Sequence, residues 1–309
     1  MSDSWGISAT ILAPVATILD FAAYHLEAGA HRLYLYLDDD NQAAFDILKA
    51  HPKIKPTLCN DAWWRGKRPK KHQVRQTQNA THAYHRRTEV DWLIHMDVDE
   101  FLVAQQPVGE ILAALPKADK IARIRPMEQL AGDGSRFKAF VPNGPDRARI
   151  VAELYPTYGP HIKGGFLSHL AGKCFVRSGL QGMRIQIHNA FQHDQMLQGP
   201  ETTAGIDLAH CHATSWEEWY AAFRYRFDKG SYRAELAPNR PREKGGLSMH
   251  ELFATIEAEN GETGLRAFFD EVCADTPALR RRLASQGLLR EVKFDLNTTT
   301  AKHFPHHSS

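Results

Sequence analysis

The sequence predicts an α/β fold built on an open, mostly parallel sheet with helices on both faces. Two observations support this prediction. Strand-like and helix-like patterns alternate from residue 8 to residue 96, and acidic clusters follow two of the strand-like segments. Because the carboxyl ends of parallel strands share one edge of a sheet, both clusters are expected at the edge where such sheets bind ligands.

The N-terminal elements follow one another closely. A strand is predicted at residues 8–12, and Pro14 then opens a helix whose apolar residues recur at helical spacing until Gly29 ends it. The alternating segment HRLYLYLDDDN predicts a second strand, with acidic residues 38–40 at its end. The following segments predict a helix at 41–51, a strand at 53–59, a polar helix at 73–87 and a strand at 91–96.

The second half of the chain has a looser pattern. A strand is expected at residues 120–126, and the many Gly and Pro residues of 126–170 predict long loops. Strand patterns return at 172–179 and 183–190. Ser215 with Glu218 is typical of a capping box that opens an aromatic helix, and three helical patterns follow Ser248.

This pattern predicts a catalytic domain at residues 1–235, a helical C-terminal extension at 236–302 and a disordered tail at 303–309.

Composition limits the classes of protein. The chain has 309 residues, of which 43% are apolar, so it can form a large globular core. A net charge of +2 argues against a protein dedicated to nucleic acid. The sequence has no run of about 18 apolar residues and no signal-peptide pattern, so we expect a cytoplasmic protein. The basic run WWRGKRPKK at 63–71 is either a solvated loop or a contact for phosphates or for the inner face of an anionic membrane.

The segment WLIHMDVDEFL joins an apolar strand to three carboxylates. Asp97 and Asp99, two residues apart at a strand end, are suited together with a phosphate to a hard divalent cation such as Mg²⁺ or Mn²⁺. Without a cation or a basic neighbour, the paired acids would repel each other. Glu100 either orients these ligands or caps the turn.

Two enzyme chemistries use a D-x-D pair at a strand end. In a phosphatase the first Asp attacks phosphorus, and in a sugar transferase the pair holds a nucleotide diphosphate through the metal. The phosphatase motif normally lies on the opening strand and has Thr or Val where this chain has Phe101. The preceding α/β segment of about 90 residues also favours the transferase. A metal-dependent phosphatase or nucleotidyltransferase remains the alternative enzyme class.

Several segments together resemble the family 2-like and family 92-like glycosyltransferases, which have the GT-A nucleotide-diphospho-sugar transferase fold. The similar segments are FAAYHLEAGAHRLYLYLDDD, RQTQNATHAY, DWLIHMDVDEFL, GKCFVR and AHCHATSWEEWYAAFRYRFDKGSYR, within residues 9–233. Many relatives carry Asn-Glu after the first strand, where this chain has ILAPVAT. A non-catalytic, carbohydrate-binding relative is therefore a third hypothesis.

The resemblance implies a metal-dependent transfer, with inversion, from a UDP-sugar to a glycan or lipid-linked acceptor in glycan biosynthesis. Asp97 and Asp99 would hold the metal, and His210 would complete its set of ligands. His212 is the alternative to His210. Asp38 would contact the base or ribose of the donor. Arg75, Gln76 and Lys173 would bind donor phosphates or sugar hydroxyls, unless they form surface salt bridges.

Inverting transfer also needs a general base that takes the proton of the acceptor hydroxyl. Glu128 follows the strand predicted at 120–126, so it is expected to face the cleft, and we select it as the base. Glu153 and Asp194 are the alternatives.

Overall fold

The computed structural model describes residues 2–86, 89–230, 232, 234, 238, 242–244 and 246–307. The chain divides into two compact units. Unit 1 comprises Met1–Arg125, Ala171–Leu208 and Asp295–Ser309, and unit 2 comprises Pro126–Leu170 and Ala209–Phe294. The predicted domain boundary at residue 235 lies outside the described residues, as do residues 308 and 309 of the predicted tail.

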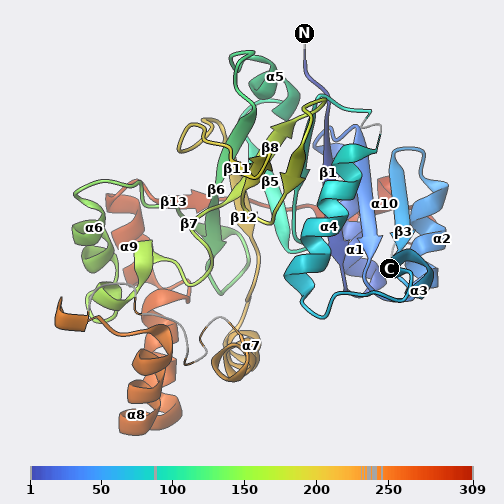
Figure 1. Cartoon of the computed structure of the whole chain (residues 1–309). Helices are drawn as coiled ribbons and strands as arrows, with labels where there is room; N and C mark the ends of the chain where they lie inside the picture. Colours follow the sequence, from blue (N-terminus) through green and yellow to red (C-terminus); the bar gives the residue numbers. More distant parts are fainter. Residues whose placement is uncertain are drawn as a thin grey trace. The chain divides into compact units, whose positions relative to one another are not determined.

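Unit 1 is built on a mixed sheet with the strand order β3-β2-β1-β4-β8-β6 (Figure 1). Strands β1 to β4 run parallel to one another, as predicted, and β8 runs antiparallel to both β4 and β6. Their bounds are Trp5–Ile11 (β1), Arg32–Leu37 (β2), Ile54–Leu58 (β3), Trp92–His95 (β4), Lys173–Arg177 (β8) and Ile121–Gln129 (β6). The α/β prediction is therefore confirmed, with antiparallel strands added to the parallel part.

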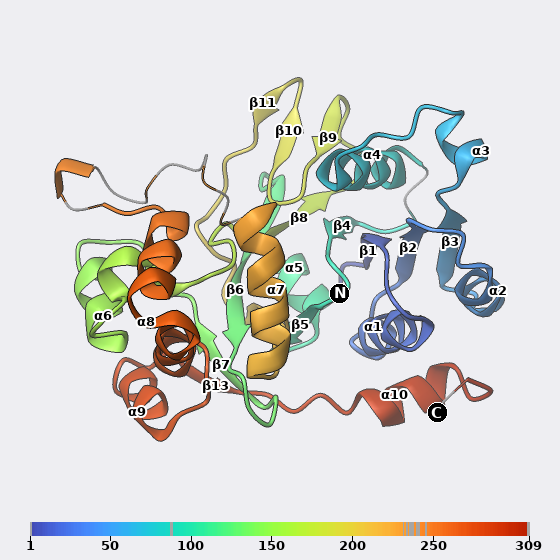
Figure 2. The ribbon, with the colours of Figure 1, turned by 90° about the horizontal axis from the view of Figure 1, so that it is seen from below.

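The alternation in β2 assigns the two faces of this sheet. Leu33, Leu35 and Leu37 join the core that contains residues of α1 (Val15–Glu27), whereas Tyr34 and Tyr36 join the core that contains residues of α4 (His72–His85). Successive side chains of a strand point to opposite faces, so α1 and α4 cover opposite faces (Figure 2). The loops at the carboxyl ends of the parallel strands remain available for a site.

The remaining elements of unit 1 complete its edges. Thr300 of α10 (Leu296–His303) donates to Asp20 of α1 at 2.6 Å, which fastens the C-terminal segment to the first helix. The described part of the chain contains no helix with the length and apolarity needed to cross a membrane. The other bounds are Gln42–Ala50 (α2), Asp61–Trp64 (α3), Glu100–Ala104 (β5), Val108–Ala113 (α5), Met183–Ile185 (β9), Ala190–Gln192 (β10), Gln195–Met196 (β11) and Ile206–His210 (β12).

Unit 2 has its own aromatic core. Trp219 and Phe223 of α7 (Trp216–Asp228) pack with Phe253 and Phe268 of α8 (Met249–Val272). Helix α7 begins at the predicted cap, where the Ser215 side chain accepts from the Glu218 amide at 3.2 Å. Its elements are Arg136–Ala139 (β7), Arg147–Leu154 (α6), Trp216–Asp228 (α7), Met249–Val272 (α8), Pro277–Ser285 (α9) and Leu289–Glu291 (β13), with short 3₁₀ turns at Gly159–His161, Lys163–Gly165 and Arg242–Lys244.

Two details differ from the sequence-based expectation. Residues 126–170, expected as long loops, contain the end of β6, strand β7 and helix α6. The long helix α8 is interrupted at Gly261, whose φ of 57° and ψ of −145° are not helical. Glycine tolerates a positive φ, so one helical pattern continues through a local break.

Candidate functional site

The D-x-D pair lies in a closed turn between β4 and β5. The amide of Glu100 donates to the Asp97 carbonyl at 3.1 Å, and the amide of Asp97 donates to Glu100 Oε2 at 2.8 Å. Asp97 and Asp99 are partly exposed, whereas Glu100 is fully buried. Glu100 therefore closes the turn from inside, while the two aspartates stay accessible at the strand end.

The Asp97 carboxylate is held by two of the predicted site residues. Lys173 Nζ lies 2.6 Å from Asp97 Oδ2 and 3.1 Å from Glu100 Oε2, and the Gln76 amide donates to Asp97 Oδ1. Lys173 is fully buried; burial alone would lower its pKa, but the charges of Asp97 and Glu100 outweigh burial and raise it. The side chain of Asp97 is still 31% exposed. The structure thus brings Gln76, Lys173 and Asp97 together with one side of the carboxylate open to solvent.

Two residues of α1 fix the strand that follows the acid turn. The Tyr24 hydroxyl donates to the Leu102 carbonyl at 2.8 Å, and the Leu102 amide donates to His25 Nε2 at 3.4 Å. Burial lowers the pKa of His25 to about 4, so the ring is neutral, and its Nδ1 donates to the Phe21 carbonyl at 2.8 Å. Tyr24 and His25 position β5. A polar residue on the apolar face of a helix is the sequence signal that reveals such a role.

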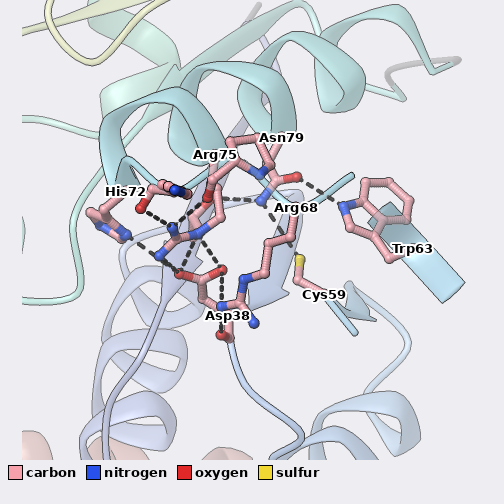
Figure 3. A network of polar contacts seen from close by, with 10 residues as sticks. Asp38, Cys59, Trp63, Arg68, His72, Arg75 and Asn79 are labelled. Atoms are coloured by element: carbon pink, nitrogen blue, oxygen red, sulfur yellow. Dashed lines mark hydrogen bonds and ion pairs between the residues drawn. The ribbon is translucent and has the colours of Figure 1, made fainter. Parts of the chain in front are cut away.

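Asp38, at the end of β2, is surrounded by cations (Figure 3). Arg75 Nε contacts both carboxylate oxygens at 2.9 Å, Arg68 Nη2 contacts Oδ1 at 3.0 Å, and His72 Nδ1 lies 3.4 Å from Oδ2. Burial would raise the pKa of Asp38, but hydrogen bonds from His72 and Arg75 and the charges of both arginines lower it to about 2. Asp38 and Arg75 are thus together, and Asp38 is an anchor for three basic side chains.

The cations around Asp38 differ in exposure. The Arg75 side chain is only 12% exposed, and its Nη1 also donates to the carbonyls of Pro69 and Lys70, at 2.9 and 3.0 Å. The side chains of Arg68 and His72 are 41% and 44% exposed. Arg75 therefore organises the loop, and the Arg68 guanidinium is the accessible positive charge beside Asp38. Arg68 belongs to the basic run that was a possible contact for phosphates, whereas the sequence did not single out His72 for the site.

A polar cavity of about 330 Å³ adjoins this cluster at the ends of β2 and β3. Arg68 lines it together with residues that directly follow the two strands. Its other lining residues are Asp39, Asp40, Cys59, Asn60, Asp61 and Ala62. Side-chain acceptors and a guanidinium suit a polar ligand such as a nucleoside.

The basic run at residues 63–71 is partly structured. Trp63 and Trp64 belong to α3, and the Trp63 indole nitrogen donates to Asn79 Oδ1 at 3.2 Å. Lys67, Lys70 and Lys71 are exposed. The contact with a membrane surface stays a prediction.

The two remaining site residues predicted from sequence, Glu128 and His210, lie in unit 2. Glu128 lies within β6 and is buried; its Oε2 is 3.0 Å from Lys138 Nζ, and its Oε1 accepts from the Ser168 amide at 2.7 Å. Burial alone would raise the pKa of Glu128, but Lys138 and these hydrogen bonds hold it well below the usual range. A carboxyl with a low pKa is a weak base at neutral pH. The role of Glu128 as general base stays a prediction.

The two candidate histidines are neighbours. The ring centroids of His210 and His212 are 4.8 Å apart, and burial lowers the pKa of His212 to about 4. The choice between them as a metal ligand stays open.

The acid turn meets the minimum needs of a hard divalent cation. Among the residues that the structure describes, no three His, Cys, Asp or Glu side chains form a metal-binding group. Mg²⁺ and similar ions, however, are commonly held by one or two carboxylates, with substrate phosphates and water as the other ligands. Asp97 accepts from Gln76 and Lys173, and its side chain is still 31% exposed. Asp97 and Asp99 therefore fit such an ion.

An α/β sheet flanked by helices, with two polar sites at one edge, is consistent with the class of GT-A-like glycosyltransferases. Residues 12–121 match the family model described as Glycosyltransferase family 92. This match confirms the resemblance to family 92, and the matched segment carries Asp38, Asp97 and Asp99.

The comparisons with curated proteins and solved structures give less information about the family of this chain. No curated protein matches the sequence. The crystal structure of HddC from Yersinia pseudotuberculosis is similar over 72% of this chain and 98% of that chain, with 11% identity and a TM-score of 0.31.

Proposed function

We propose that this glycosyltransferase-like chain moves a sugar from a nucleotide-diphosphate donor, a UDP-sugar, to a hydroxyl group of a glycan or lipid-linked acceptor, with inversion, in glycan biosynthesis. The observation that supports this most strongly is the pair of polar sites at the carboxyl ends of β2 and β4. One is the polar cavity beside Asp38, which Arg68 lines together with several side-chain acceptors, and the other is the partly exposed acid turn at Asp97 and Asp99.

The spacing of the two sites suits one extended ligand. Strand β1 separates β2 from β4, and neighbouring strands lie about 4.8 Å apart, so the two strand ends are about 10 Å apart. That span suits a nucleoside in the cavity with its diphosphate directed towards the acid turn. The exposed guanidinium of Arg68 lies at the nucleoside end and favours the anionic donor.

The chain's own residues prepare this site for departure of a nucleotide diphosphate. Lys173 and Gln76 hold Asp97 in one orientation, and Glu100 keeps the turn closed. A bound Mg²⁺ or Mn²⁺ would neutralise the charge that develops on the leaving diphosphate. Asp97 and Asp99 would be its protein ligands. Preorganised ligands reduce the reorganisation needed during the reaction.

Thermal unfolding with a panel of nucleotide diphosphates tests this proposal. We expect UDP with Mn²⁺ to raise the Tm of the wild-type chain by a few degrees, because a ligand that binds only the folded state stabilises it. Chelator should remove the shift, and Asp97→Asn should lose it. Asp228→Asn is the control, because Asp228 is exposed at the end of α7 and lies outside both polar sites. No shift with any nucleotide would refute the proposal.

A further inference from the structure

A second cavity lies in unit 2, between the start of α7 and the second half of α8. Its volume is about 440 Å³, which is within the range of small-molecule sites. The lining residues are Trp216, Glu262, Thr263, Arg266, Ala267 and Asp270. We propose that this cavity binds a neutral saccharide and serves as a subsite for the acceptor glycan, an inference that rests on the proposed glycosyltransferase function.

One of the lining side chains, Trp216, is aromatic. Trp216 is partly buried, stacks on Tyr220 at 5.1 Å between ring centroids and meets the edge of Phe269 at 5.4 Å. The indole is thus held rigidly by its neighbours. A rigid aromatic surface suits the apolar C–H face of a pyranose, because it offers a large contact area at low entropic cost.

The walls offer hydrogen-bonding groups from one side of α8. Glu262, Thr263, Arg266 and Asp270 are exposed and follow one another at helical spacing. Carboxylates accept from hydroxyl groups, the guanidinium donates to them, and a threonine hydroxyl does both. The small side chain of Ala267 leaves space among these groups. An aromatic ring with hydrogen-bond donors and acceptors beside it suits a sugar ring.

The charge of the walls selects against phosphates. Two carboxylates and one guanidinium give a formal charge of −1 at neutral pH, whereas a nucleotide diphosphate is strongly anionic. A neutral saccharide is not repelled by the negative charge of the walls. The cavity is therefore suited to an acceptor sugar and not to the donor.

Arg266 covers the ring in the free protein and is easily displaced. Its guanidinium carbon lies 5.0 Å from the Trp216 ring centre, and its Nε lies 3.5 Å from Asp270 Oδ1. Both side chains of that ion pair are about half exposed, at 50% and 51%. Exposed cation–π contacts and exposed ion pairs are weak. A sugar can therefore move Arg266 off the ring and still use it as a hydrogen-bond donor.

The test is binding of a panel of neutral di- and trisaccharides built from glucose, galactose, mannose and N-acetylglucosamine, measured by saturation-transfer NMR and calorimetry. We expect at least one saccharide to bind the wild-type chain. Ala267→Phe should fill the cavity and weaken binding at least about tenfold. Ala258→Phe, on an exposed position of the same helix outside the cavity, should leave binding unchanged.

Two further measurements keep the outcomes distinct. Glu262→Gln removes a charge from an exposed residue without adding bulk and should also weaken binding, so the conclusion does not depend on Ala267→Phe alone. Absence of binding by the whole panel, or equal affinity in Ala267→Phe and wild type, would overturn the inference. The UDP-dependent rise in Tm, measured on the same samples, reports on the proposed function separately. Saccharide binding without any nucleotide binding would indicate a carbohydrate-binding protein.

Discussion

Each unit of the molecule contains a buried lysine paired with carboxylates, and the two pairs differ in their access to solvent. Lys173 and Lys138 have side chains that are 0% and 2% exposed. The partner of Lys138, Glu128, is 1% exposed, whereas Asp97, a partner of Lys173, is 31% exposed. The pair of Lys138 and Glu128 is therefore enclosed within unit 2. In unit 1, the carboxylate that pairs with Lys173 is partly exposed at a strand end.

The surroundings of the two lysines explain this difference. Lys138 also donates to the Val272 carbonyl at 2.9 Å and lies 5.3 Å from the Tyr155 ring centre, so its whole ammonium group is enclosed. Lys173 is enclosed as well, but it reaches from β8 to a turn where the Asp97 side chain is 31% exposed. A buried lysine thus indicates a site only where its partner reaches solvent.

The largest effect is expected for Lys138→Met. The substitution leaves Glu128 buried without its counter-charge, which typically costs about 3–5 kcal/mol of unfolding free energy. Urea unfolding followed by circular dichroism measures this loss. The double variant Lys138→Met/Glu128→Met should recover much of it, because both charges are then absent. A loss below about 1 kcal/mol in the single variant would show that the pair is not enclosed.

A smaller loss is expected for Lys173→Met. Glu100 would remain buried and lose its cation, but it keeps the Asp97 amide as a donor, and Asp97 itself reaches water. We expect about 2–3 kcal/mol, less than for Lys138→Met. The same urea measurement ranks the two variants. If Lys173→Met proved the more destabilising, the contrast between an open and a closed pair would be wrong.

Asp38 adds to this comparison a buried carboxylate that contacts two arginines and a histidine. Its pKa is about 2 in the folded protein and about 3.9 when unfolded, so its stabilising contribution is complete above about pH 5 and is lost progressively as the pH falls to about 1. That contribution is about 2.5 kcal/mol. The difference in unfolding free energy between wild type and Asp38→Asn, measured across this range, should shrink by that amount. A difference that does not change with pH would contradict the account.

The smallest effect is expected for a surface pair. Arg149 contacts Glu153 at 2.7 Å on α6, but the two side chains are 57% and 46% exposed. Arg149→Ala should change the unfolding free energy by at most about 0.5 kcal/mol, since exposed i,i+4 pairs contribute little. A loss comparable to that of Lys173→Met would mean that exposure does not decide the strength of these pairs.

The alternation of apolar residues predicted the parallel part of the fold well. In β2, Leu33, Leu35 and Leu37 alternate with tyrosines, and each set faces its own core, so the local pattern was sufficient. The position of Asp38 and Asp97 at strand ends followed from the same pattern. Residues 126–170 were less predictable, because their glycines and prolines hide the short elements β7 and α6.

The side chains that contact the acidic site residues could not be predicted from the sequence. Arg68 and His72 surround Asp38 only because the loop before α4 folds back over β2, a contact that spans about 30 residues of chain. The pairing of Glu128 with Lys138 arises from the register of β6 and β7, which no local pattern specifies. Residue type and spacing identified the acidic site residues, whereas only the tertiary structure shows which side chains contact them.

The central claim is that the acid turn after β4 serves the transfer of a sugar from a nucleotide. Release of UDP from UDP-sugars in the presence of Mn²⁺ tests it most directly, with wild type, Asp97→Asn, Asp99→Asn and the Asp228→Asn control. The account predicts turnover in wild type and control, and a loss of at least about 100-fold in both turn variants with their folding intact. Full activity in both turn variants would contradict it.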